Sequence, residues 1–177
     1  MADLIQNVLI LEDNQDDALL IKRQVKKAYP EATFSIAEDR DSFLKKITWM
    51  SPSLVLSDYN LPDYNGLEAL LYCRENMPQV PFVFVTGVLD DQEKAADAIL
   101  NGAAGYILKD NMRSMHERLP EIVDRFRANL STAELLRDKV TRARLLTQKL
   151  DAKIQAGALD DCRPIVTELR QLLAAEV

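Results

Sequence analysis

Through residue 110, short apolar runs alternate with longer segments whose apolar residues recur at helical spacing. Five short runs are rich in β-branched or aromatic residues and predict β-strands at 7–11, 33–37, 54–57, 82–86 and 105–108. The longer segments between these runs carry apolar residues at the spacing of an α-helix. Parallel strands need crossover connections of this kind. The pattern therefore predicts an α/β fold, with a five-stranded, parallel, doubly wound sheet and helices on both faces.

A heptad pattern begins near residue 120 and continues to about residue 155. Pro120 suits the first turn of a helix, because an N–H there has no partner within the helix. Two interpretations stay open: one continuous helix over about 120–155, which we favour, or two helices divided at Ser131, which could form a capping box with Glu134. The heptad positions are mostly apolar: Ile122, Phe126, Asn129, Ala133, Leu136, Val140, Ala143, Thr147, Leu150 and Ile154.

A second helix is expected at about 160–175, after Gly157 ends the first one, with Asp160 or Asp161 as its cap. The sequence thus predicts an α/β domain over residues 1–130 and a C-terminal helical hairpin over residues 131–177. One hairpin alone buries little apolar surface, so pairing of two hairpins in a homodimer is expected. The apolar face of the second helix would be Ile165, Val166, Leu169, Leu172 and Leu173.

Charge and composition exclude several classes of function. Residues 1–130 hold 14 Lys and Arg against 21 Asp and Glu, and residues 131–177 hold 8 against 7, which together make the net charge of −6. Neither part has the basic excess of a DNA-binding surface, so no DNA partner is expected. The first 13 residues lack the basic region and the long apolar run of a signal peptide or membrane span. With two cysteines and no disulfide framework, a cytoplasmic protein without a membrane partner is predicted.

Polar side chains stand at the ends of four predicted strands. Glu12 and Asp13 follow the first strand, Asp58 the third, Thr86 ends the fourth, and Lys109 follows the fifth. The carboxyl ends of the strands form the ligand crevice of open α/β sheets. Three carboxylates close together repel one another, so a hard cation is expected to neutralise them, and all-oxygen ligands suit Mg²⁺. A carboxylate beside Mg²⁺ can accept a phosphoryl group, whose charge an ammonium and a hydroxyl can stabilise.

Residues 5–130 resemble the receiver domain of two-component response regulators, which has a flavodoxin-like sheet. Four motifs in order carry this resemblance: "LILED", "LSDYNLPDYNGLE", "FVTG" and "AAGYILKD". The resemblance implies that Asp58 is the phosphoacceptor. It implies that Asp13, Asp58 and the backbone carbonyl of Asn60 bind Mg²⁺, and that Glu12 acts through a bound water.

The resemblance also implies roles for three residues of the last two strands. Lys109 would pair with the phosphoryl oxygens, and Thr86 and Tyr106 would form the family's switch pair. In the family a proline usually follows the lysine, whereas Asp110 stands here. A trans peptide bond is expected at this position, since a cis bond without proline is costly. Asp110 is also a candidate competitor for the Lys109 ammonium.

The function implied is a phosphorylation-dependent signalling switch that catalyses only its own phosphorylation and dephosphorylation. Its expected partners are a sensor histidine kinase or a histidine phosphotransfer protein, and an unidentified downstream protein. An RNA-binding antiterminator-type regulator, acting through the C-terminal helices, is the alternative. Away from the site, Trp49 and Cys73 are expected to be packing residues.

Overall fold

The strand and helix pattern folds into one parallel five-stranded sheet. The computed structural model describes residues 5–62, 64–87, 97–158 and 161–174. The order across the sheet is β2-β1-β3-β4-β5, and every neighbouring pair is parallel. All five predicted strand ranges are confirmed: β1 (Asn7–Leu11), β2 (Thr33–Ala37), β3 (Leu54–Ser57), β4 (Phe82–Thr86) and β5 (Gly105–Leu108).

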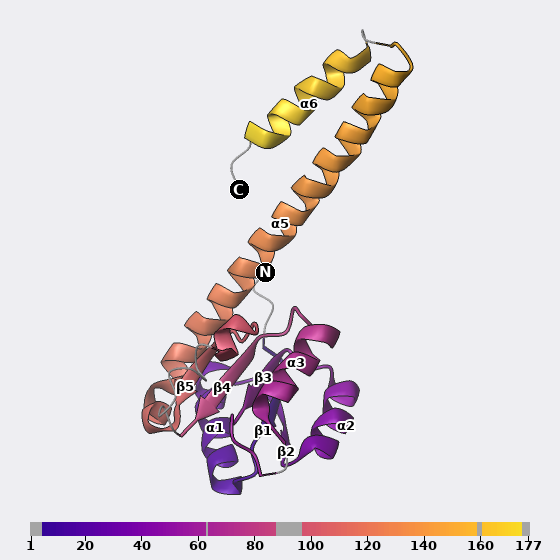
Figure 1. Cartoon of the computed structure of the whole chain (residues 1–177). Helices are drawn as coiled ribbons and strands as arrows, with labels where there is room; N and C mark the ends of the chain where they lie inside the picture. Colours follow the sequence, from indigo (N-terminus) through magenta and orange to yellow (C-terminus); the bar gives the residue numbers. More distant parts are fainter. Residues whose placement is uncertain (1–4, 63, 88–96, 159–160, 175–177) are drawn as a thin grey trace. The chain divides into compact units, whose positions relative to one another are not determined.

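Helices connect the strands and follow the last one (Figure 1). They are α1 (Gln15–Ala28), α2 (Arg40–Met50), α3 (Gly66–Asn76), the 3-10 helix η1 (Lys109–Ser114), α5 (Met115–Gln155) and α6 (Cys162–Ala174). The fourth predicted connecting helix covers residues 90–103; residues 90–96 lie outside the described residues, and residues 97–100 are helical. Side-chain caps start the first three helices, from Asn14, Asp39 and Asn65.

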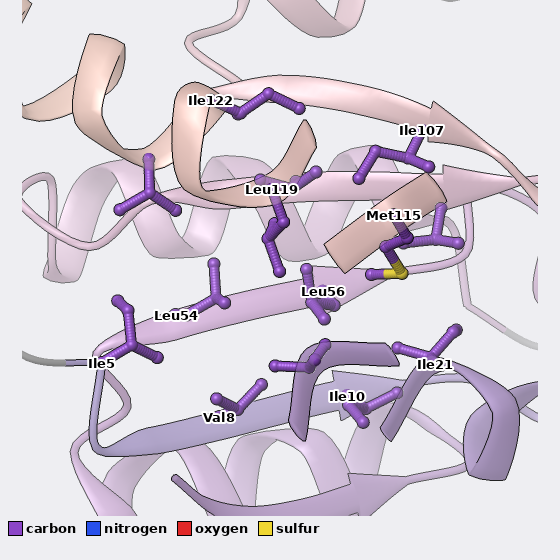
Figure 2. Packing of buried hydrophobic residues seen from close by; sticks show 14 of the residues in the cluster. Ile5, Val8, Ile10, Ile21, Leu54, Leu56, Ile107, Met115, Leu119 and Ile122 are labelled. Atoms are coloured by element: carbon purple, nitrogen blue, oxygen red, sulfur yellow. The ribbon is translucent and has the colours of Figure 1, made fainter. Parts of the chain in front are cut away.

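Each central strand is buried on both faces, because its alternate side chains enter two separate cores. Val8 and Ile10 of β1 belong to the core under α1 and α5, and Leu9 and Leu11 to the core under α2 and α3. Figure 2 shows the first of these cores, in which α5 lies over the sheet. The residues that α5 places there are Met115, Leu119, Ile122 and Val123, none of them more than 6% exposed.

The start of α5 differs from the expected one. The helix begins at Met115, directly after η1, so Pro120 lies inside it and not in its first turn. Proline there removes one backbone hydrogen bond. Met115 and Leu119 before the proline and Ile122 and Val123 after it are buried against the sheet, which stabilises the helix on both sides of the proline and offsets this loss.

The chain divides into two compact units, Met1–Arg127 and Ala128–Val177, and α5 contributes to both. Helix α5 is continuous through Ser131, as favoured from the heptad pattern. It ends at Gln155, close to Gly157 as predicted, and Gly157 has a left-handed conformation with a φ of 71°.

The C-terminal unit is a helical hairpin whose buried stripe differs from the predicted heptad. Arg142 pairs with Glu168 at 2.6 Å and Lys153 with Asp161 at 2.7 Å, so this face of α5 contacts α6 and the turn before it. Leu146, and not the predicted Thr147, is the buried residue, 5% exposed. Two predicted heptad positions, Ala143 and Leu150, are half-buried, so the prediction is confirmed there, and Leu146 takes the place of Thr147 between them.

Two expected packing residues have opposite outcomes. Cys73 in α3 is fully buried, and burial raises the pKa of its thiol to about 12. Trp49 is 83% exposed, so its predicted packing role is wrong. It stands near the end of α2, whose buried residues Phe43 and Ile47 lie on another face of the helix.

Gly66 starts α3 against the backbone of the loop after β3. A Cβ atom there would clash with the carbonyl oxygen of Asp58 and lie 3.0 Å from the Cα atom of Tyr59. We expect Gly66→Ala to lower the free energy of unfolding by about 1–3 kcal/mol, because backbone atoms cannot move aside as side chains do. Urea unfolding measures the change.

Gly87→Ala is the matched control for this variant. The nearest atom to its added Cβ would be Cδ of Lys109 at 3.7 Å, an ordinary contact. Equal stabilities of the two variants would contradict the crowding at Gly66.

Candidate functional site

Four neighbouring strands bring the predicted polar residues to one edge of the sheet. Leu11 of β1 lies beside Ser57 of β3, so the residues that follow each strand, Glu12 and Asp58, become neighbours. Strands β3 and β4 are neighbours, as are β4 and β5. Thr86, the last residue of β4, and Lys109, which follows β5, therefore stand at the same edge. The strand register explains why residues distant in sequence meet here.

Three carboxylates gather at this edge. Oxygen atoms of Glu12, Asp13 and Asp58 lie within 4.8 Å of one another. Glu12 is 1% exposed and Asp58 8%, whereas Asp13 is exposed. Burial raises the pKa of Glu12 above its usual value, against the lowering effect of the Lys109 ammonium, and the charge of Asp58 raises it further. The cluster therefore concentrates negative charge that needs a cation.

Lys109 supplies the positive charge of the site. Its Nζ atom lies 2.8 Å from Oδ2 of Asp58, 2.9 Å from Oε2 of Glu12 and 2.7 Å from Oδ2 of Asp17. Burial acts to lower the pKa of Lys109, but the hydrogen bonds to these carboxylates outweigh it and raise the pKa above its usual value. The ammonium is thus charged and held by three carboxylates.

Asp17 is the residue of this site that sequence reasoning missed. It lies in the first turn of α1, is 92 residues from Lys109 in the chain, and its side chain is 34% exposed. A signal was available, because Asp17 stands four residues before Ile21, which is buried under the sheet. A carboxylate on the inner face of the helix after "LED" points to a charged partner.

Asp110, the expected competitor for the ammonium, is exposed and is not among the ion-pair partners of Lys109 in the described part of the chain. Asp17 takes that place. The described residues contain no cis peptide bond, so the Lys109–Asp110 bond is trans as expected. The 3-10 helix η1 starts at Lys109, and Asp110 lies in its first turn with its side chain exposed to solvent.

The backbone around Asp58 is fixed from several sides. Its N–H donates to the carbonyl oxygen of Leu11 at 2.9 Å, and the hydroxyl of Ser57 donates to its carbonyl oxygen at 2.7 Å. The N–H of Asn60 donates to Oδ1 of Asp58 at 3.3 Å, and an antiparallel bridge joins Asn60 to Asn65. The carboxylate is therefore positioned before any ligand arrives.

Thr86 and Tyr106 lie on neighbouring strands and are both half-buried. In the register of β4 and β5, Phe84 is beside Tyr106 and Thr86 is beside Leu108, so the two residues are offset by two positions. Tyr106 packs against the core under α2 and α3. Their switch role stays a prediction.

The donor set fits a hard divalent cation. Oε2 of Glu12 is buried and, apart from its ion pair with Lys109, has no hydrogen-bond partner in the described residues. Buried polar atoms are normally satisfied, so this oxygen is available to a metal-bound water or to a metal ion. Together with Asp13 and Asp58 it forms an acidic pocket that could bind Mg²⁺.

This sheet order and this set of side chains define a receiver-type signalling domain. Residues 8–120 match the family model "Response regulator receiver domain", and the chain belongs to this family. The predicted receiver domain is thus confirmed. No helix in the described ranges has both the length and the apolar character needed to cross a membrane.

Several curated proteins are similar to the chain. It is 39% identical over 59 residues to the transcriptional regulatory protein MctR of Rhizobium johnstonii, covering 33% of this chain and 27% of MctR. It is 27% identical over 162 residues to the uncharacterized transcriptional regulatory protein YxjL of Bacillus subtilis, covering 89% of this chain and 71% of YxjL. It is 26% identical over 174 residues to the nitrate/nitrite response regulator protein NarL of Escherichia coli, covering 86% of this chain and 80% of NarL.

Solved structures confirm the predicted fold. A CheY-like receiver domain protein from Methanospirillum hungatei has a TM-score of 0.61 at 26% identity, covering 71% of this chain and 98% of that chain. The BeF3-activated DrrB receiver domain has a TM-score of 0.59 at 19% identity, covering 68% and 99%.

Removing the Lys109 ammonium should destabilise the protein. Lys109→Met would leave the carboxylates of Glu12, Asp17 and Asp58 without their common cation, and we expect a loss of about 1–3 kcal/mol in the free energy of unfolding. Urea unfolding in the presence of a chelator measures it. The control is Lys153→Met, which breaks an exposed ion pair and should change the midpoint little. A loss no larger than that of the control would contradict the electrostatic role of Lys109.

Proposed function

We propose that this chain is a phosphorylation-dependent switch of a two-component system and that Asp58 is its phosphoacceptor. The observation that carries the proposal is the Asp58 carboxylate, fixed at the end of β3 with the Lys109 ammonium at 2.8 Å and two further carboxylates beside it. Membership of the receiver family supports it.

The phosphoryl transfer would be a substitution at phosphorus. An oxygen of the Asp58 carboxylate forms a bond to the phosphorus of the donor, while the bond from phosphorus to the leaving group breaks. With acetyl phosphate, acetate leaves with the electron pair; with a phosphohistidine, the imidazole leaves and takes up a proton. The Lys109 ammonium stabilises the charge on the phosphoryl oxygens, and the Thr86 hydroxyl would add a hydrogen bond.

Glu12, Asp13, Asp58 and the backbone carbonyl of Asn60 would hold Mg²⁺. The ion supplies charge neutralisation for the carboxylate cluster and for the phosphoryl group. Asp13, the exposed member, is the accessible ligand, and buried Glu12 would act through a water. The chain's own contribution is to keep these oxygens close together before the ion binds.

The output would follow from Thr86 and Tyr106 and from α5. A hydroxyl drawn toward the phosphoryl group leaves space beside β4 for the half-buried ring of Tyr106. Because α5 supplies core residues and also forms the first helix of the hairpin, a shift of its packing could reach the tail.

We propose protein–protein contact as the form of this output. A sensor histidine kinase or a histidine phosphotransfer protein would supply the phosphoryl group, and a downstream protein would bind the switched form. Two of the relatives, MctR and YxjL, are transcriptional regulatory proteins. The described C-terminal unit of this chain consists of two helices, and residues 131–177 hold only one more Lys and Arg than Asp and Glu, far from the basic excess of a DNA-binding surface. Beyond its own phosphorylation and dephosphorylation, no enzymatic activity is proposed.

A homodimer through the C-terminal unit is part of the proposal. Within this unit α6 covers only one stripe of α5. The large apolar side chains of α5 that stay 44–68% exposed are Leu135, Leu136, Val140, Leu145 and Ile154. A second copy of the hairpin would bury such side chains in a four-helix bundle.

The phosphoacceptor is tested by labelling with acetyl phosphate and Mg²⁺. We expect one phosphoryl group per chain in the wild type, mapped to Asp58 by mass spectrometry after borohydride trapping, and almost none in Asp58→Asn. A chelator should abolish the label, and Asp13→Asn should weaken it. Label persisting at the wild-type level in Asp58→Asn would show that another residue accepts the phosphoryl group.

The dimer is tested by light scattering on the full chain at tens of micromolar. We expect the wild type to be dimeric and the double variant Leu136→Glu, Val140→Glu to be monomeric, because it places charges in the proposed interface. The control variant is Thr141→Glu, Gln148→Glu, which adds the same charge at exposed polar positions of α5. A monomeric wild type would refute the bundle.

A further inference from the structure

We propose that Asp17 competes with the incoming phosphoryl group for the Lys109 ammonium and thereby slows phosphorylation of Asp58. The inference rests on the proposed function. It assigns a positioning role to a carboxylate that lies outside the proposed metal site and that touches the site only through Lys109.

The first argument is the number of donors on the ammonium. Nζ of Lys109 has three N–H donors. Three carboxylate oxygens lie within 2.9 Å of it, and that of Asp17 is the nearest at 2.7 Å. Nζ donates hydrogen bonds to Asp17 and Asp58, while Oε2 of Glu12 is held only as an ion pair without hydrogen-bond geometry. A phosphoryl oxygen that approaches the ammonium therefore competes with these carboxylates for it.

The second argument is which carboxylate can leave. Glu12 is 1% exposed, so separation from the ammonium would leave its charge buried. Asp58 must stay, since it receives the phosphoryl group. The Asp17 side chain is 34% exposed and can be hydrated when it moves away. Asp17 is therefore the partner that exchanges, and its attraction for Lys109 opposes the exchange.

The third argument is charge. Glu12, Asp17 and Asp58 pair with one ammonium, Asp13 lies close to two of them, and a phosphoryl donor brings further negative charge. The three carboxylates of the proposed metal site are compensated by the ion. The carboxylate of Asp17 would not be compensated by the ion, so its attraction for the Lys109 ammonium persists and opposes the transfer of that ammonium to a phosphoryl oxygen.

Asp16 offers a matched control for Asp17. The two residues are adjacent in the first turn of α1, and the backbone N–H groups of both donate to Oδ1 of Asn14, at 3.0 and 3.1 Å. Both carboxylates interact favourably with the helix N-terminus. Only Asp17 reaches Lys109, and Asp16 is exposed. A comparison of the two separates the contact with Lys109 from the helix-dipole effect.

The test measures initial rates of Asp58 phosphorylation by acetyl phosphate at saturating Mg²⁺ in the full chain. We expect Asp17→Asn, and Asp17→Ser as a second variant, to be phosphorylated roughly three- to tenfold faster than the wild type. Asp16→Asn should stay close to the wild-type rate. In a Lys109→Met background, Asp17→Asn should give no acceleration, because the ammonium for which Asp17 competes is gone.

Three results would overturn the inference while the proposed function stands: Asp17 variants that match Asp16→Asn, Asp17 variants that react more slowly than the wild type, and an acceleration that persists without Lys109. If the wild type takes up no phosphoryl group at Asp58, the proposed function fails, and the inference fails with it.

Discussion

The structure depends on the balance between the carboxylates at the carboxyl edge of the sheet and the single ammonium of Lys109. Two of these carboxylates, Glu12 and Asp58, are almost fully buried, a costly place for charge unless a cation compensates it. Lys109 reaches both, and Asp17 as well, from the end of β5. The strands, the η1 turn and the first turn of α1 together keep these groups within ion-pair distance.

The rest of the α/β unit can be understood as the support of this edge. The central strands bury side chains on both faces, which makes the sheet rigid and fixes where each strand ends. The close approach of Gly66 to the backbone of Asp58 and Tyr59 fixes the loop after β3. Met115 and Leu119 of α5 are buried in the core beside η1. Helix α5 therefore begins directly after the short helix whose first residue is Lys109, the residue that would contact the phosphoryl group.

The C-terminal unit, unlike the sheet, has few buried apolar side chains among its described residues. Leu146 is its one buried large apolar side chain in the described residues, and its helices contact each other through the exposed ion pair Arg142–Glu168, which contributes little free energy. Several large apolar side chains of α5, among them Val140 at 68%, stay exposed. Burial of these side chains against a partner would stabilise the hairpin, which is the basis of the proposed dimer.

The sequence by itself determined the strand ranges, their parallel arrangement with helical crossover connections, and most residues of the candidate site. Strand ranges were predictable because short β-branched runs between turn formers have few alternatives, and Glu12, Asp13, Asp58 and Lys109 stood at strand ends, which meet at one edge. Tertiary structure decided what depends on helix phase and on neighbours in space. Asp17 entered the site because the first turn of α1 faces Lys109. Leu146 is buried in place of Thr147 because the side of α5 that carries Arg142 is the one that faces α6. Trp49 stayed exposed because nothing in the described chain covers that side of α2. Local pattern fixes which elements form, but only packing in three dimensions fixes which of their side chains meet.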